Sequence, residues 1–491
     1  MIKISSDGKE LDLISSKNRK DKILIEVIGG NAENVTGSAS LVTYNKKQLL
    51  FEFGMIQRGK NIYENYMLNK ELLSSIKTSR LDYIIIGHCH CDHIGLIPAL
   101  YQKNCDATVI VPAGSYAILK EMWLDSAYIN ERDADILTAQ RERTFTPLFN
   151  EQNVYEALNH VRELNFHEII SLDDELSIRY SYAGHILLSA QTELFITQKN
   201  HTKKILFTSD LGNLNLKDSK IFVEPFEPVT SANIVIGEAT YSSQQKPVTK
   251  KDFLLDMDKI RTVIQQYCMD EKGIVLIPCF SLDRLPYMLW LLYSMDDQLD
   301  VPIIVDSPLG LRLLQAYRSI LPADVKDQFE SLLSWDKLKF IKTPEDSMAA
   351  IVDHKPKVVL ASSGMLTAGR SVKWTQSVIT QHNNCILFIG YAATATLAYR
   401  IKHSKENPTI TINGKICKNN ANIVDLHSFS SHMQHDDLLK YYAGINTEKI
   451  YLVHSNQESK LLFKQELEQR IAENCRSTRV IAVNRSTKIT L

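Results

Sequence analysis

Several hallmarks of other protein classes are missing from this 491-residue chain. No window approaches the roughly 20 apolar residues that a membrane span requires, so we expect no contact with a membrane. The polar start, MIKISSDGKELDL, lacks the apolar stretch of a signal peptide. None of the eight cysteines belongs to a CxxC pair, which disfavours a zinc knuckle or a disulfide scaffold. These absences predict a reducing compartment: the cytoplasm, or the nucleus in a eukaryote.

The chain also lacks net charge. It has 56 Lys and Arg against 57 Asp and Glu, a formal charge of -1, so broad electrostatic attraction to nucleic acid is not indicated. A polyanionic substrate would need a local basic groove or bound metal ions. What the chain does have is 44% hydrophobic and 23% charged residues, the balance of an ordinary globular protein. Its length predicts two domains.

The order of strand-like and helix-like segments divides the chain into three parts. β-Branched runs such as KILIEVIG and SASLVTY open the sequence without helices between them, which predicts an antiparallel start. The early strand-like runs include LDYIIIGH, and helices are expected over 116–141 and 154–163. Four more strand-like runs lead to NIVIGEA, so we assign residues 1–240 to the first part of a layered α/β domain.

The second part, residues 241–398, alternates strands with helices. A helix over 252–268 precedes GIVLIPCF, and further helices separate PIIVD, KVVLASS and CILFIGY. This alternation predicts a parallel sheet covered on both faces. In residues 399–491 we expect a hairpin from TITING and ICKNNANIVDL, then KIYLVHS and RVIAV with helices between. This last part is predicted to complete the first domain.

Four ligand-type residues follow the buried run LDYIIIG in the sequence HCHCDH, residues 88–93. Alternate residues of an extended chain point the same way, so His88 and His90 should project together. Three imidazoles and a carboxylate favour zinc, with manganese and iron as alternatives. Cys89 and Cys91 occupy the intervening positions, and we interpret them as buried thiols instead of ligands.

The HCHCDH sequence resembles the HxHxDH signature of the metallo-β-lactamase superfamily. AGH at 183–185 and TSDLG at 208–212 are similar to two later motifs of that superfamily. The resemblance implies two metal ions, expected to be zinc. The implied ligands of the first ion are His88, His90 and His185, those of the second are Asp92, His93 and His454, and Asp210 bridges both ions.

The middle part resembles the β-CASP insertion of nucleases. EATY at 238–241, FSSH at 429–432 and the LVHS that contains His454 resemble its three marker motifs. The implied fold is a metallo-β-lactamase αββα sandwich with an inserted β-CASP parallel-sheet α/β domain. The implied activity is RNA phosphodiester hydrolysis by a two-metal-activated hydroxide, with His432, oriented by Glu238, as general acid. Taken singly, Glu238 could equally be a surface acid, and His432 a helix cap.

His454 is typical of RNA-processing members, so single-stranded RNA is the expected substrate. The layout is similar to compact prokaryotic relatives of the cleavage and polyadenylation endonuclease, and a homo-oligomer or an RNA-processing complex is compatible with it. Cleavage within the strand and from its 5′ end both remain open. The alternatives are a non-catalytic RNA-processing scaffold subunit, a DNA nuclease and a small-molecule hydrolase of the same superfamily.

Some positions depart from the family pattern. Glu52 stands where an Asp usually supports the metal loop. Gln434 and Ser455 replace the usual residues after two motif histidines, and Ala395 begins ATLA where GTLG is usual. These changes leave the predicted ligands intact but could alter substrate choice and turnover. Small residues could cradle a substrate phosphate with their backbone amides, although the same residues also form ordinary turns. The candidates for this role are Ser362, Ser363, Gly364 and Thr396.

Overall fold

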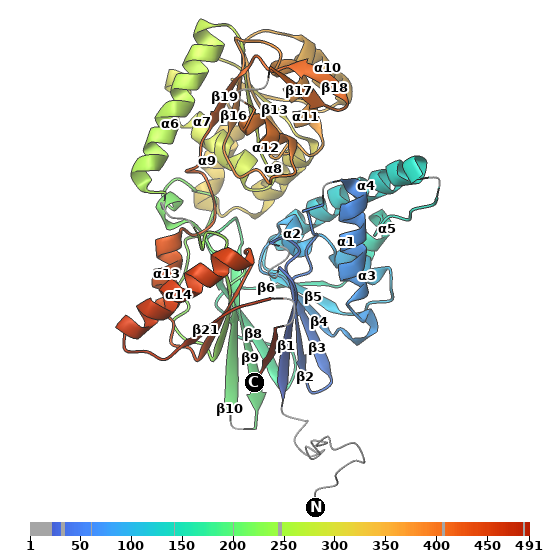
Figure 1. Ribbon diagram of the computed structural model, residues 1–491, viewed down its shortest axis with the longest axis vertical. Helices are drawn as coiled ribbons and strands as arrows, with labels where there is room; N and C mark the ends of the chain where they lie inside the picture. The colour runs from blue at the N-terminus through green and yellow to red at the C-terminus, as the bar shows by residue number, and fades with distance from the viewer. Residues whose placement is uncertain are drawn as a thin grey trace, which may run out of the picture.

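The computed structural model describes most of the chain and divides into two lobes (Figure 1). The described residues are 22–30, 35–59, 61–141, 143–199, 201–243, 248–404, 408–484 and 487–491. The polar start, from which we predicted the lack of a signal peptide, lies outside them. Within these residues, no helix combines the length and apolar character needed to cross a membrane.

The larger lobe contains two seven-stranded sheets packed face to face. The first sheet has the order β22-β1-β2-β3-β4-β5-β6. Its strands are β1 (Ile23–Gly29), β2 (Ala39–Tyr44), β3 (Lys47–Phe51), β4 (Tyr83–Ile85), β5 (Thr108–Pro112), β6 (Val161–Leu164) and β22 (Lys488–Thr490). β1, β2 and β3 pair antiparallel, as the opening sequence predicts, and β3 to β6 pair parallel.

The second sheet has the order β21-β20-β11-β10-β9-β8-β7. Its strands are β7 (Ile170–Ser171), β8 (Leu176–Tyr182), β9 (Ala190–Gln198), β10 (His201–Phe207), β11 (Ile234–Glu238), β20 (Lys449–Val453) and β21 (Arg479–Ala482). β20 and β21 come from the last part of the chain, which therefore returns to complete this lobe as expected. Alternate residues of β1 are buried between the sheets, and the rings of Phe51 and Phe207 stack across the interface with centroids 3.7 Å apart.

Helices cover the outer faces of both sheets, which gives the αββα order (Figure 1). Those associated with the first sheet are α1 (Ile62–Ser74), α2 (Cys91–Ile94), α3 (Ile97–Tyr101), α4 (Ser115–Arg141) and α5 (Glu151–Asn159). α13 (His435–Gly444) and α14 (Gln457–Glu473) lie beside the second. A 3₁₀ turn, η2 (Leu214–Leu216), follows β10.

The smaller lobe contains a parallel six-stranded sheet of order β14-β13-β15-β12-β16-β19. Its strands are β12 (Ile274–Pro278), β13 (Ile303–Asp306), β14 (Leu338–Phe340), β15 (Lys357–Ala361), β16 (Cys385–Phe388) and β19 (Asn422–Asp425). Its helices are α6 (Lys250–Ile264), α7 (Arg284–Tyr293), α8 (Pro308–Ile320), α9 (Ala323–Leu333), α10 (Pro344–Val352), α11 (Arg370–Val378) and α12 (Leu397–Lys402). The expected αββα sandwich with an inserted parallel-sheet domain is confirmed.

Three local expectations differ from the structure. α1 separates β3 from β4, so the opening strands are not free of helices. The segment expected to be helical to residue 163 ends its helix at Asn159 and enters β6, where its backbone pairs with β5. The expected hairpin is formed by β17 (Thr409–Ile412) and β18 (Lys415–Lys418), but β19 pairs with β16. The parallel sheet therefore extends to Asp425, beyond the boundary expected at residue 398.

Candidate metal centre

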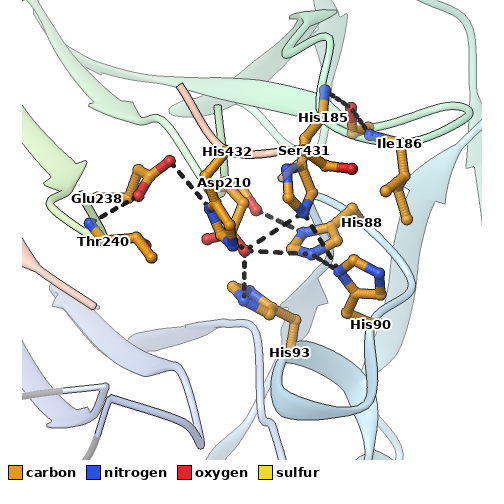
Figure 2. A network of polar contacts seen from close by, with 12 residues as sticks. His88, His90, His93, His185, Ile186, Asp210, Glu238, Thr240, Ser431 and His432 are labelled. Atoms are coloured by element: carbon orange, nitrogen blue, oxygen red, sulfur yellow. Dashed lines mark hydrogen bonds and ion pairs between the residues drawn. The ribbon is translucent and has the colours of Figure 1, made fainter. Parts of the chain in front are cut away.

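Five of the seven predicted ligands lie close together in Figure 2: His88, His90, His93, His185 and Asp210. The HCHCDH segment follows β4, the AGH segment follows β8, and the TSDLG segment follows β10. Two further segments follow β11 and β20 and carry Glu238 and His454. Residues that are distant in sequence therefore meet because their strands end at the same edge.

Close backbone packing fixes the loops that carry these residues. A Cβ on Gly54 would lie 1.6 Å from the carbonyl oxygen of Asp92, so only glycine lets the segment after β3 pass beneath α2. A Cβ on Gly212 would lie 1.9 Å from the carbonyl oxygen of Gly184, which packs the TSDLG and AGH loops back to back. Trp123 of α4 supports α2 by donating from Nε1 to the Ile94 carbonyl at 3.0 Å.

The first group of donor atoms belongs to His88, His90, His185 and Asp210. Nδ1 of His90 lies 3.1 Å from Nε2 of His88 and 3.3 Å from Nε2 of His185. Oδ2 of Asp210 lies 3.6 Å from Nε2 of His88 and 3.7 Å from Nε2 of His185. A tetrahedron built on zinc–nitrogen bonds of about 2.0–2.1 Å has edges of about 3.3–3.4 Å. The observed separations bracket that value, so the set fits a tetrahedral ion.

The second group belongs to Asp92, His93 and His454, and Asp210 borders it too. Nε2 of His454 lies 3.4 Å from Oδ2 of Asp92, and Nε2 of His93 lies 3.9 Å from the same oxygen. Oδ2 of Asp210 is 3.4 Å from Nε2 of His93, so this single oxygen faces histidines of both groups. The arrangement places the Asp210 carboxylate where a bridging ligand would have to lie.

Unsatisfied buried atoms also favour a metal ion here. Within the described residues, Nε2 of His93 and Oδ1 of Asp210 are buried without a hydrogen bond. Leaving such atoms unpaired is costly, and a shared cation removes that cost. The residues present therefore fit a metal ion by geometry and by donor chemistry.

The protonation states of the three histidines in the first group suit ligation. Burial lowers the pKa of His90 to about 4 and the pKa values of His88 and His185 well below their usual value. These three rings are thus neutral, the form that coordinates metal. Burial alone would raise the pKa of Asp210, but the neighbouring histidines, of which His454 contributes most, hold it well below its usual range.

Glu52 contacts one histidine of the second donor group directly and one of the first group through Ser209. Its Oε2 lies 2.7 Å from Nδ1 of His93. Its Oε1 accepts a hydrogen bond of 2.6 Å from the Ser209 hydroxyl, which lies 2.9 Å from Nδ1 of His88. Carboxylates and hydroxyls in such positions fix the ring orientation of a ligating histidine. On the other side, Oγ1 of Thr240 lies 3.0 Å from Nδ1 of His454 and acts in the same way.

Glu238 and His432 lie beside the ligand cluster (Figure 2). The Glu238 carboxylate accepts hydrogen bonds from two backbone amides. Its Oε1 accepts from the Leu211 N–H and its Oε2 from the Thr240 N–H, both at 2.9 Å. Nδ1 of His432 lies 3.4 Å from Glu238 Oε1 and 3.9 Å from Asp210 Oδ2. His432 is partly exposed, with 21% of its side-chain surface accessible, whereas Glu238 is buried.

The two cysteines of HCHCDH stay outside the described ligand groups. Cys89 is buried and Cys91 is half-buried at the start of α2. Burial raises the pKa of each thiol to about 12, so neither is a thiolate near neutral pH.

The candidate phosphate-binding residues lie at the carboxyl end of the parallel sheet. Ser362 and Ser363 follow β15, and the Ser362 hydroxyl contacts the Ser307 hydroxyl at 2.8 Å. Gly364 packs against Phe280. Thr396 is buried as the N-cap of α12, and its hydroxyl accepts from the Tyr399 N–H. The hydroxyls of Ser362 and Thr396 thus form hydrogen bonds within the smaller lobe. A role of these candidates in binding substrate stays a prediction.

Several residues at the site were not identified from the sequence. Ser209 and Thr240 lie inside the recognised motifs TSDLG and EATY. Their positions close to Asp210 and Glu238 in the sequence could have identified them as residues of the site. Phe280 and Tyr391 are exposed aromatic residues, 41% and 70% accessible, after the neighbouring parallel strands β12 and β16. Lys220 had no sequence signal, because its partners are distant in the chain.

Comparison with known families identifies two segments. Residues 284–401 match the Beta-Casp domain. Residues 418–477 match the family described as "Zn-dependent metallo-hydrolase RNA specificity domain". The second match contains His432 and His454, and the first contains the candidate phosphate-binding residues.

Two similar proteins align with most of this chain. Ribonuclease TTHA0252 of Thermus thermophilus is 28% identical over 442 residues, which is 88% of this chain and 93% of that protein. The transcription termination factor FttA of Methanothermobacter thermautotrophicus is 26% identical over 459 residues, 90% of this chain and 68% of that protein.

A crystal structure of a protein of unknown function from Enterococcus faecalis has the same fold, with a TM-score of 0.53 and 13% identity. The alignment covers 96% of this chain and 99% of that one. The matched domains, the layered sheets and the donor cluster agree: the chain has a metallo-β-lactamase fold that contains a Beta-Casp domain.

Proposed function

We propose that this protein is a zinc-dependent ribonuclease that hydrolyses phosphodiester bonds of single-stranded RNA. The observation that carries the proposal is the position of Asp210, whose Oδ2 lies within 3.4–3.7 Å of three histidines from two ligand groups. A pair of cations about 3.5–4 Å apart would activate a water for in-line attack and stabilise the charge of the phosphate. The names of the similar proteins and the matched RNA specificity domain support RNA as substrate.

We assign the side chains of this site to two metal ions. His88, His90 and His185 would hold the first ion, and Asp92, His93 and His454 would hold the second. The Asp210 carboxylate borders both groups and would contribute a ligand to each ion. The rings of His88, His90 and His185 are neutral, so they can bind a cation without releasing protons. Burial alone would lower the pKa values of His93 and His454, but the neighbouring carboxylates raise the pKa of His93 well above its usual value and that of His454 to about 9, so these two rings must release a proton before they bind.

His432 serves as the general acid in this proposal. It is the partly exposed histidine beside the buried cluster, so its ring can reach both the solvent and a bound phosphodiester. Glu238 is anchored by two backbone amides and therefore holds the His432 ring in a fixed orientation. A proton delivered to the leaving oxygen typically accelerates such a reaction by about 10²–10⁴-fold.

Exposed aromatic residues support a single-stranded substrate. Phe280 and Tyr391 stand at the carboxyl ends of adjacent parallel strands, the edge of the smaller lobe from which Asp283 reaches the site. Unpaired bases stack on such side chains with little sequence preference, whereas paired bases are unavailable for stacking. Because the chain carries almost no net charge, we assign phosphate binding mainly to the metal centre.

The test compares cleavage of an end-labelled single-stranded RNA with that of the matched DNA. The wild type should cut the RNA in the presence of zinc, and Asp210→Ala should reduce the rate by orders of magnitude. Asp218→Ala is the matched control, because Asp218 is an exposed carboxylate on the same loop, paired with Lys250. Zinc-loaded wild type that cuts neither strand would reject the proposal and favour a small-molecule hydrolase or a scaffold subunit.

A further inference from the structure

A buried lysine lies directly behind the proposed catalytic histidine. Lys220 follows η2 and is only 4% exposed. Its ammonium donates to the His185 carbonyl at 2.9 Å, to Oδ1 of Asp283 at 3.0 Å and to the Ser431 hydroxyl at 2.6 Å. An ammonium has three hydrogens, so every donor of Lys220 is used. Such full satisfaction indicates a built polar network instead of an accidental contact.

The partners of Lys220 connect both lobes to the site. Asp283 precedes α7 in the smaller lobe, is 3% exposed, and has a left-handed backbone with φ of 63°. Ser431 precedes His432 and donates its hydroxyl hydrogen to Oδ2 of Asp283 at 2.6 Å. The network therefore joins the smaller lobe, the backbone of the ligand His185 and the residue next to His432.

The backbone around His432 is held on both sides. The Ser431 carbonyl accepts from the Asn213 N–H at 2.8 Å, and the Met433 N–H donates to the Leu211 carbonyl at 2.7 Å. These two hydrogen bonds attach the backbone of residues 431–433 to the TSDLG loop. The Ser431 hydroxyl restrains the same segment through its side chain. Within the described residues, it is the only side-chain group next to His432 that contacts Lys220 and Asp283.

We propose that Lys220, Asp283 and Ser431 are positioning residues that aim His432 at the leaving oxygen. The inference rests on the proposed function, in which His432 donates the proton. Polar groups in a low-dielectric interior keep one arrangement because alternative arrangements leave buried atoms unpaired. The smaller lobe thus contributes to the alignment of the acid through Asp283, in addition to any contact with the substrate.

The test uses two substrates that differ in their need for an acid. RNA releases a ribose oxygen, which must be protonated as it leaves, whereas bis(p-nitrophenyl) phosphate releases p-nitrophenolate, a weak base that leaves without a proton. Ser431→Ala should slow single-turnover RNA cleavage at least tenfold and change p-nitrophenolate release less than twofold, with unchanged metal content. His432→Ala should show the same selective loss, and Ser431→Thr should restore RNA cleavage.

Ser428→Ala is the matched control. Ser428 is a buried serine of the same segment, and its hydroxyl also donates to an aspartate, Asp256, at 2.7 Å. It lies outside the network, so both rates should stay at the wild-type level. Lys220→Met alone leaves a buried charge uncompensated and could prevent folding. The double variant Lys220→Met with Asp283→Leu removes both charges and should show the selective loss of RNA cleavage.

The outcomes separate the two proposals. If Ser431→Ala cuts RNA at the wild-type rate, or slows both substrates equally, the positioning role is wrong while the ribonuclease assignment stands. Equal slowing of both substrates by the double variant would contradict the positioning role in the same way. Zinc-loaded wild type that hydrolyses the p-nitrophenyl ester but never RNA would instead reject the proposed function itself.

Discussion

Neutralising Glu52 should weaken metal binding without removing any ligand. Glu52 supports one histidine of each group, since Oε2 contacts His93 directly and Oε1 contacts His88 through Ser209. In Glu52→Gln, one of these two oxygens becomes an NH₂ group. If the NH₂ faces His93, Nδ1 must accept instead of donate, and the ring proton moves to Nε2, where it blocks ligation. If the NH₂ faces Ser209, the support of His88 is lost.

Loss of one such contact typically weakens metal affinity by about 10–100-fold. That range corresponds to about 1.4–2.7 kcal/mol of metal-binding free energy. The assay is zinc competition with a chromophoric chelator, followed by RNA cleavage over a range of free zinc. We expect Glu52→Gln to need more zinc but to recover most of its rate at saturation, and Glu52→Asp, which keeps the charge, to lose less. Wild-type zinc affinity in Glu52→Gln would refute the reasoning.

Three further predictions concern other positions. Thr240→Val removes the hydroxyl beside His454 Nδ1, and it should weaken one of the two metal equivalents by about 10–100-fold in a zinc titration while leaving the other unchanged. Trp123→Ala removes a fully buried ring that supports α2, and denaturant unfolding should show a loss of about 3–5 kcal/mol. Arg312→Ala breaks two partly exposed ion pairs, with Glu121 and Asp125 of α4, and the same measurement should show a loss of less than about 1 kcal/mol.

The clustering of the candidate donor side chains could be predicted from the sequence because its signals are local. HCHCDH is contiguous, and the other ligands fall at the ends of recognisable strands, where the fold brings them together. Glu52 could be identified in the same way, since it directly follows β3, which pairs with β4. The alternating strands and helices of the middle part predicted a parallel sheet for a similarly local reason.

The remaining features depend on contacts between distant segments. β6 has a sequence compatible with a helix, and only pairing with β5 makes it a strand. The sequence of β19 was interpreted as the continuation of a hairpin, but β19 pairs in parallel with β16. Lys220 and Ser431 are 211 residues apart, so no pattern in the sequence could associate them.

The central claim is that two metal ions together cleave RNA, and one zinc titration tests it most directly. Metal-free protein receives increasing equivalents of zinc, and bound metal and single-turnover RNA cleavage are measured in the same samples. We predict that two equivalents bind per chain and that cleavage appears only as the second equivalent binds. Full cleavage after one equivalent, or intact RNA with both equivalents bound, would contradict this account.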